Sequence, residues 1–129
     1  MNLRILVVED SETTRRIIRA ILETSEWKIC GEAKNGRAGI AQFKKLRPDV
    51  VVIDVSMPGM SGIETARAMS KTDPLVPLIL FTLSDTKEIY EAARDAGICA
   101  LVSKEHAWDL VGTIESATAQ RSGSDQLVQ

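Results

Sequence analysis

The sequence predicts a doubly wound α/β fold, in which helices cover both faces of an open parallel sheet. Five short apolar runs alternate with segments of helical periodicity, and parallel strands need such helical crossovers between them. The run at residues 50–53 is apolar and β-branched throughout, which is typical of a strand buried on both faces. Polar or charged residues directly follow most of these runs, so the strand ends are candidate functional positions.

Composition limits the function classes. A chain of 129 residues with 44% hydrophobic residues has the length of one domain and can bury a core without metals or disulfides. Its 16 basic and 18 acidic residues are spread along the chain, so no basic stripe indicates direct binding of nucleic acid or an anionic membrane. The apolar runs are too short to cross a bilayer and the start has no signal-peptide core, so we expect a cytoplasmic protein. Cys30 and Cys99, each beside an isoleucine, are expected to be small buried residues.

In the first half of the chain, strands are expected at residues 3–8, 27–33 and 50–53, and helices begin after residue 11 and at residue 37. Asp10 or Ser11 is the natural N-cap of the first helix. One buried stripe of that helix follows the helical repeat through Ile17, Ile18, Ile21 and Leu22. The second helix is expected to end before Pro48, because a residue that precedes proline avoids the helical region.

The second half repeats this pattern. Helices are expected at residues 63–71, 89–96 and 107–119, and strands at 77–82 and 99–103, with Gly97 ending the second of these helices. Residues 121–129 have the composition of a flexible tail. We therefore divide the chain into one domain over residues 1–120 and a C-terminal tail over residues 121–129.

Chemistry-bearing residues follow four of the five predicted strands. An open parallel sheet binds ligands outside the carboxyl ends of its strands, where this sequence has Glu9, Asp10, Asp54, Thr82 and Lys104. Carboxylates held within a few ångströms repel one another, so a cation is expected among the three acids. An all-oxygen site favours Mg²⁺, with Mn²⁺ as a substitute, and disfavours Zn²⁺ because His106 is the only histidine.

With the acids partly neutralised by a cation and Lys104, a carboxylate oxygen of Asp54 can attack a phosphoryl group and form an acyl phosphate. The Lys104 ammonium, the Thr82 hydroxyl and backbone N–H groups can stabilise the transferred oxygens. Each residue alone also has an ordinary role, as a helix cap, a turn former, a strand-end hydroxyl or a solvated lysine. Their joint occurrence at the strand ends favours the functional interpretation.

Over residues 3–119 the chain resembles the receiver domain of two-component response regulators. The resemblance rests on the acidic pair Glu9-Asp10, the phosphoacceptor position Asp54, its loop with Met57-Pro58 and Gly62, the switch hydroxyl Thr82, and Lys104. It implies a flavodoxin-like sheet of order 2-1-3-4-5, Mg²⁺ dependence, self-catalysed dephosphorylation and a switch in which Thr82 moves toward the phosphoryl group. It also makes the backbone carbonyl of Ser56 a metal ligand.

The chain departs from the family's pattern at three positions. Leu101 stands where many receivers carry an aromatic that rotates inward with the threonine. Glu105 replaces a proline after the lysine, so no cis peptide is expected there, and this junction is similar to receivers that precede a helix-turn-helix output domain. Leu83 follows the threonine where small residues are common, so we expect it to narrow access to the acyl phosphate.

The resemblance also implies partners. The phosphoryl donor is a sensor histidine kinase or a histidine phosphotransfer protein, which we expect to dock on the start of the first helix around Thr13, Thr14 and Ile17. The output is a downstream protein target or an output domain outside these residues, reached through the fourth helix, fifth strand and fifth helix. A phosphorylation-dependent homodimer is a further candidate assembly.

The same pattern has three other interpretations. A degenerate receiver that binds proteins independently of phosphorylation is the main alternative. A flavodoxin-like electron carrier is disfavoured, because Glu9 and Asp10 would repel a bound phosphate. A phosphatase with an aspartyl intermediate would need a second acid where the chain has Ser56.

Overall fold

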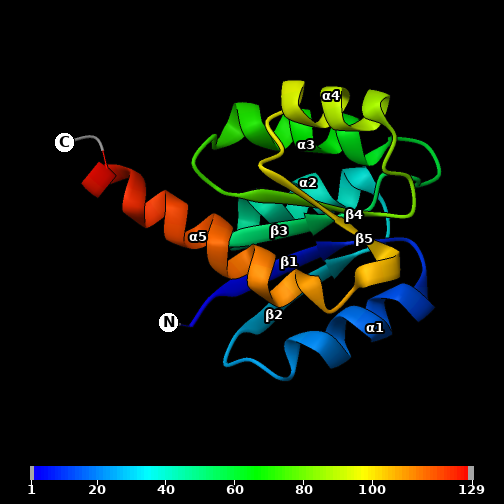
Figure 1. The fold of residues 1–129 in the computed structure, drawn as a ribbon. Helices are drawn as coiled ribbons and strands as arrows, with labels where there is room; N and C mark the ends of the chain where they lie inside the picture. The colour runs from blue at the N-terminus through cyan, green and yellow to red at the C-terminus, as the bar shows by residue number, and fades with distance from the viewer. Residues whose placement is uncertain (1, 128–129) are drawn as a thin grey trace.

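The computed structural model describes residues 2–127, with side chains through residue 119 (Figure 1). One sheet of five parallel strands has the order β2-β1-β3-β4-β5, as predicted. The strands are β1 (Arg4–Val8), β2 (Lys28–Ala33), β3 (Val50–Ile53), β4 (Leu78–Thr82) and β5 (Ala100–Ser103). The doubly wound α/β fold is therefore confirmed.

Helices cover both faces of the sheet. They are α1 (Glu12–Leu22), α2 (Gly36–Leu46), α3 (Gly62–Thr72), α4 (Lys87–Asp95) and α5 (Asp109–Leu127), and a short 3₁₀ turn, η1 (Lys104–His106), follows β5. Figure 1 shows α1 and α5 on one face and α2, α3 and α4 on the other. Ser11 is the N-cap of α1, and its side chain accepts a hydrogen bond from the Thr14 N–H. Among the described helices none is both long and apolar enough to cross a membrane.

Side chains along the central strands point alternately to the two faces of the sheet, where they form two separate hydrophobic cores. In β3, Val51 and Ile53 pack with α2, α3 and α4, whereas Val50 and Val52 pack with α1 and α5. Every side chain of β3 is buried, as its apolar run predicted. A strand held on both faces in this way gives a rigid mount for Asp54, the residue that follows it.

The loop after β3 closes tightly over that residue. The Gly62 N–H donates to the Val55 carbonyl at 2.9 Å. A Cβ atom at Gly62 would lie 1.9 Å from the Asp54 carbonyl oxygen, so only glycine lets the two backbone segments approach this closely.

The end of the last helix was predicted wrongly. Instead of stopping at Ala119, α5 continues to Leu127, into the segment expected to be a tail. Gly123 and its serine and aspartate neighbours lower helix propensity in residues 120–127, but no proline interrupts this segment, so nothing in the sequence forces an earlier end. Residues 128 and 129 of the predicted tail lie outside the described residues.

Burial was predicted wrongly for several apolar residues. Cys99 is exposed and directly precedes β5, whereas Cys30 is half-buried and lies in β2. Both strands are at an edge of the sheet and have a neighbouring strand on one side only. In α1, Ile17 is 45% exposed, so the buried stripe is narrower than the apolar pattern indicated.

Candidate functional site

The three predicted acids converge at one edge of the sheet. Glu9 and Asp10 follow β1, and Asp54 follows β3, whose Ile53 pairs with Val8 of β1. The Asp54 N–H donates to the Val8 carbonyl at 2.9 Å, which fixes the two strand ends side by side. One carboxylate oxygen from each acid lies within 4.8 Å of the others. Glu9 and Asp54 are buried and Asp10 is exposed, so a hydrated cation has access from the Asp10 side.

Lys104 follows the edge strand β5, and its side chain extends past the end of β4 to the acidic cluster. Its Nζ lies 2.8 Å from Glu9 Oε1 and 3.2 Å from Asp54 Oδ1. Burial by itself lowers the pKa of Lys104, but pairing with Glu9 and the charge of Asp54 outweigh it and raise the pKa. The ammonium therefore stays charged while it bridges two buried carboxylates.

Glu9 is the most perturbed acid of the cluster. Burial raises the pKa of its carboxyl to about 7, although Lys104 and the Ser11 N–H, 3.1 Å from Oε2, act in the opposite direction. The ion pair with Lys104 is close. Among the buried side-chain nitrogen and oxygen atoms of the described residues, Glu9 Oε1 is the one without a well-directed hydrogen bond. The three carboxylates together offer an all-oxygen set of ligands, so the residues present fit a hard divalent ion.

Thr82 and Ser56 lie at the same end of the sheet as the acids. Thr82 ends β4 beside Ser103 of β5 and is 2% exposed, and its Oγ1 accepts a hydrogen bond from the Ser84 N–H at 3.0 Å. Ser56 is exposed in the loop after β3. Its carbonyl as a metal ligand and the hydroxyl of Thr82 as a switch stay predictions.

The three positions that depart from the family's pattern differ in burial. Leu101 is half-buried, packs against the core under α4 and pairs with Leu80. Leu83 is 67% exposed, just beyond Thr82. The described residues contain no cis peptide bond, so the peptide between Lys104 and Glu105 is trans as expected.

Sequence reasoning missed Arg15. Its side chain is 5% exposed, and its Nη1 donates to the backbone carbonyls of Glu9 at 2.8 Å and Asp10 at 3.2 Å. The signal was present, because Arg15 lies three and seven residues before Ile18 and Leu22, on the buried face of α1. A cation on that face indicated a buried charged group that needs partners.

The sequence model of the response regulator receiver domain matches residues 5–115. The chain belongs to this receiver family. Over 97 residues it is 32% identical to the chemotaxis protein CheY of Thermotoga maritima, covering 75% of this chain and 81% of CheY. It is 38% identical over 124 residues to a protein-glutamate methylesterase/protein-glutamine glutaminase of Alkalilimnicola ehrlichii, covering 93% of this chain. The receiver spans about a third of the length of such methylesterase relatives, 31% in this case.

Solved receiver structures agree in fold. The response regulator domain of Thermotoga maritima CheB superposes with a TM-score of 0.85 at 27% identity, covering 92% of this receiver and 97% of that chain. A LuxR-family two-component response regulator from Aurantimonas gives a TM-score of 0.88 at 28% identity, covering 94% and 88%. The receiver identity, the flavodoxin-like fold and a role in two-component signalling are thus shown at the level of the family.

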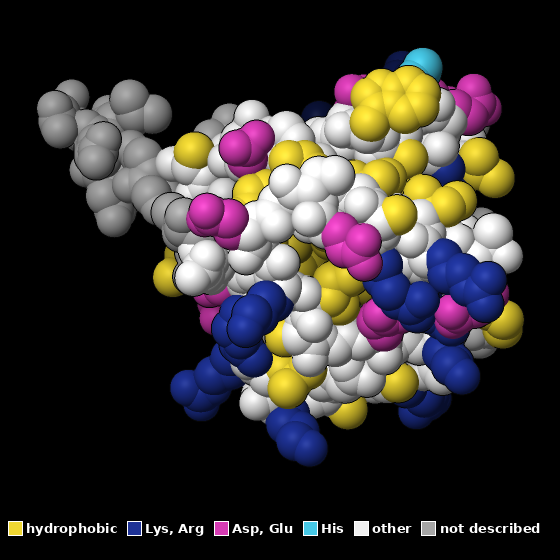
Figure 2. Space-filling view, turned by 90° about the horizontal axis from the view of Figure 1, so that it is seen from below, with side chains coloured by type: hydrophobic (Ala, Val, Ile, Leu, Met, Phe, Trp, Pro, Cys, Tyr) yellow, Lys and Arg dark blue, Asp and Glu magenta, His cyan; other side chains and the backbone are white. Residues whose placement is uncertain are grey.

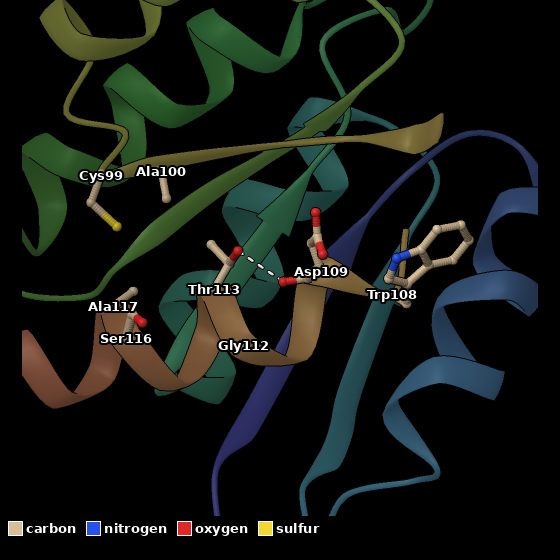
Figure 3. A pocket seen from close by; sticks show the side chains of 8 residues that line it. All are labelled: Cys99, Ala100, Trp108, Asp109, Gly112, Thr113, Ser116 and Ala117. Carbon is tan, nitrogen blue, oxygen red and sulfur yellow. Dashed lines mark hydrogen bonds between the residues drawn. The ribbon is translucent and has the colours of Figure 1, made fainter. Parts of the chain in front are cut away.

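A cavity lies apart from the acidic cluster. It has a volume of about 550 Å³ and is bounded by the start of β5 and by α5, with Cys99, Trp108 and Gly112 among its lining residues (Figure 3). The Thr113 hydroxyl in its wall donates to the Asp109 carbonyl at 2.8 Å. None of the six predicted site residues lines this cavity, so it is separate from the acidic cluster.

Proposed function

We propose that this receiver accepts a phosphoryl group on Asp54 from a phosphohistidine, with Mg²⁺ bound beside it, and that the acyl phosphate switches the domain's surface. The observation that carries the proposal is the bridge from Lys104 to Asp54 and Glu9 inside a cluster of three acids. A lysine in that position neutralises charge where an anionic phosphoryl group must arrive.

Glu9, Asp10, Asp54 and the Ser56 carbonyl would hold the cation, which supplies charge neutralisation for the phosphoryl oxygens when bound. An Asp54 oxygen attacks phosphorus, the P–N bond to the histidine breaks, and its electron pair stays on the imidazole nitrogen. Lys104 then pairs with a phosphoryl oxygen instead of the Asp54 carboxylate. Hydrolysis reverses the state, because water attacks phosphorus and releases inorganic phosphate from Asp54.

The Thr82 hydroxyl provides the switch in this proposal. In the structure it accepts a hydrogen bond from the Ser84 N–H. Turning toward a phosphoryl oxygen on Asp54 makes this hydroxyl a donor and frees the Ser84 N–H, which loosens the start of the β4–α4 loop. Leu101 fills the half-buried position under α4, so no aromatic rotation accompanies the change in this chain.

We propose the surface of α4, β5 and α5 as the output face. The cavity between β5 and α5 and a second one of about 290 Å³ between α4 and β5 flank the same edge strand. Tyr90 and Trp108, 52% and 72% exposed, add aromatic area on either side. The partner is a downstream protein or an output domain, and a phosphorylation-dependent homodimer on this face is a further arrangement. Matched relatives are described as methylesterases and as a LuxR-family regulator.

Incubation with Mg²⁺ and acetyl phosphate tests the chemistry, with intact-mass measurement of the product. We expect the gain of one phosphoryl group, its loss in Asp54→Asn, and its retention in Asp95→Asn, an exposed acid at the end of α4. Labelling that persists in Asp54→Asn, or that maps to a serine or threonine, would refute the proposal. A degenerate receiver would show no labelling in any variant.

A further inference from the structure

Arg15 ties the segment that carries two of the three acids to the body of the domain. Its guanidinium donates from Nη1 to the carbonyls of Glu9 and Asp10. On the other side of the Glu9 Cα atom, the Glu9 N–H donates to the Ala33 carbonyl at 2.9 Å. The backbone of Glu9 is therefore held at its N–H by β2 and at its carbonyl by α1.

The guanidinium is itself held by acids. Arg15 pairs with Glu12 through Nη2 and with Glu32 of β2 through Nε, at 3.2 Å in the latter case. Arg19 completes the arrangement with two hydrogen bonds of 2.7 Å to Glu32. Hydrogen bonds from Arg19 also lower the pKa of Glu32, which keeps this carboxylate ionised. Figure 2 shows acidic and basic side chains adjoining on the face that α1 and α5 cover.

We propose that Arg15 is a positioning residue for the cation site: through the Glu9 and Asp10 carbonyls it fixes the strand-to-helix segment so that both carboxylates meet Asp54. The inference rests on the proposed function, because it concerns the same site. Partners outside the ligand shell of a metal raise affinity by orienting the ligands, and their loss typically weakens binding about 10- to 100-fold. Arg15 acts on the backbone, so we expect the lower end of this range.

The sign of the effect separates positioning from simple electrostatics. A positive charge near a cation site repels the cation, so removal of Arg15 by charge alone would tighten Mg²⁺ binding. Loss of positioning weakens it. Arg19 is a matched control, since it also pairs with Glu12 and Glu32 but donates no hydrogen bond to the Glu9 or Asp10 carbonyls.

Titration of the ¹⁵N-labelled protein with Mg²⁺, followed through the amide shifts of Glu9, Asp10 and Asp54, measures the dissociation constant directly. We expect Arg15→Met to weaken Mg²⁺ binding about tenfold and Arg19→Met to change it by less than about twofold. At saturating Mg²⁺, labelling of Arg15→Met by acetyl phosphate should return to near the wild-type rate, because the chemistry at Asp54 is retained.

Binding by Arg15→Met that equals or exceeds the wild type would overturn the inference, as would an equal loss in Arg19→Met. Should Arg15→Met fail to fold, Arg15→Lys gives the same test. It keeps the charge, but one ammonium cannot span two carbonyls and two carboxylates, so a loss of about threefold is expected. Unchanged binding in Arg15→Lys would then refute the role. Absence of Mg²⁺ binding in the wild type would instead refute the proposed function, and this inference with it.

Discussion

The substitution Glu9→Gln tests the electrostatics of the acidic cluster most directly. It removes an ionisable group from a buried position while nearly preserving its shape. Burial raises the pKa of Glu9 from 4.5 to about 7 in the folded protein. Between these values the folded state keeps a proton that the unfolded chain releases, so the cation-free wild type loses stability as pH rises through this interval.

The magnitude follows from the difference between the two pKa values, 4.5 and about 7. At about 1.4 kcal/mol per tenfold change, the full loss of stability is about 3 kcal/mol. Solvent at the exposed Asp10 side screens part of this, so we expect about 1–3 kcal/mol. Glu9→Gln has no such loss, and it should gain this amount relative to the wild type between about pH 4.5 and about pH 8.

Urea unfolding in the presence of a chelator measures this difference at each pH, with Glu26→Gln, an exposed acid in the turn before β2, as the control. With excess Mg²⁺ at the higher pH the order should invert, because the ion stabilises the wild type and Glu9→Gln lacks a ligand. A free-energy difference between Glu9→Gln and the wild type that is the same near pH 4.5 as near pH 8 would refute the reasoning.

Three further outcomes are expected. Gly62→Ala should destabilise the protein by about 2–4 kcal/mol in urea unfolding, because its Cβ would lie 1.9 Å from the Asp54 carbonyl; a loss below about 0.5 kcal/mol would contradict the close approach. Ile17→Glu, at an exposed position in the middle of α1, should slow phosphotransfer from the cognate kinase at least about tenfold and leave labelling by acetyl phosphate unchanged. Leu75→Glu, at a residue 70% exposed before β4, is its control, and equal loss from both donors would argue against docking at Ile17. Leu83→Ala should shorten the lifetime of the acyl phosphate, since Leu83 is expected to narrow water's access, and an unchanged or longer lifetime in a phosphate-release assay would count against this role.

The sheet and the acidic cluster were predictable because both depend on local signals. Apolar runs and helical repeats define the elements, and the rules of parallel sheets bring the strand ends to one edge. Glu9, Asp10, Asp54 and Lys104 therefore met as expected.

What the sequence did not reveal depends on long-range packing. Periodicity places Ile17 on the apolar stripe of α1 but does not say whether another element covers this side chain, and it is exposed. Arg15 was missed for the opposite reason, since its charge suggested solvent whereas its position placed it on the buried face of α1. The end of α5 lacks a strong stop signal, so composition alone misplaced it.

Lys104 links β5 to the ends of β1 and β3, two strands with which β5 shares no backbone hydrogen bonds. It starts from the end of β5, the edge strand, and its ammonium contacts carboxylates that follow β1 and β3, with β4 in between. An edge strand has ladder bonds on one side only, so its local opening requires less free energy than that of the central strands. The two ion pairs thus hold the edge strand β5 to the residues that follow the central strands β1 and β3. A change of charge at Asp54 therefore acts directly on one of the two ion pairs that hold the edge strand β5 to the centre of the sheet.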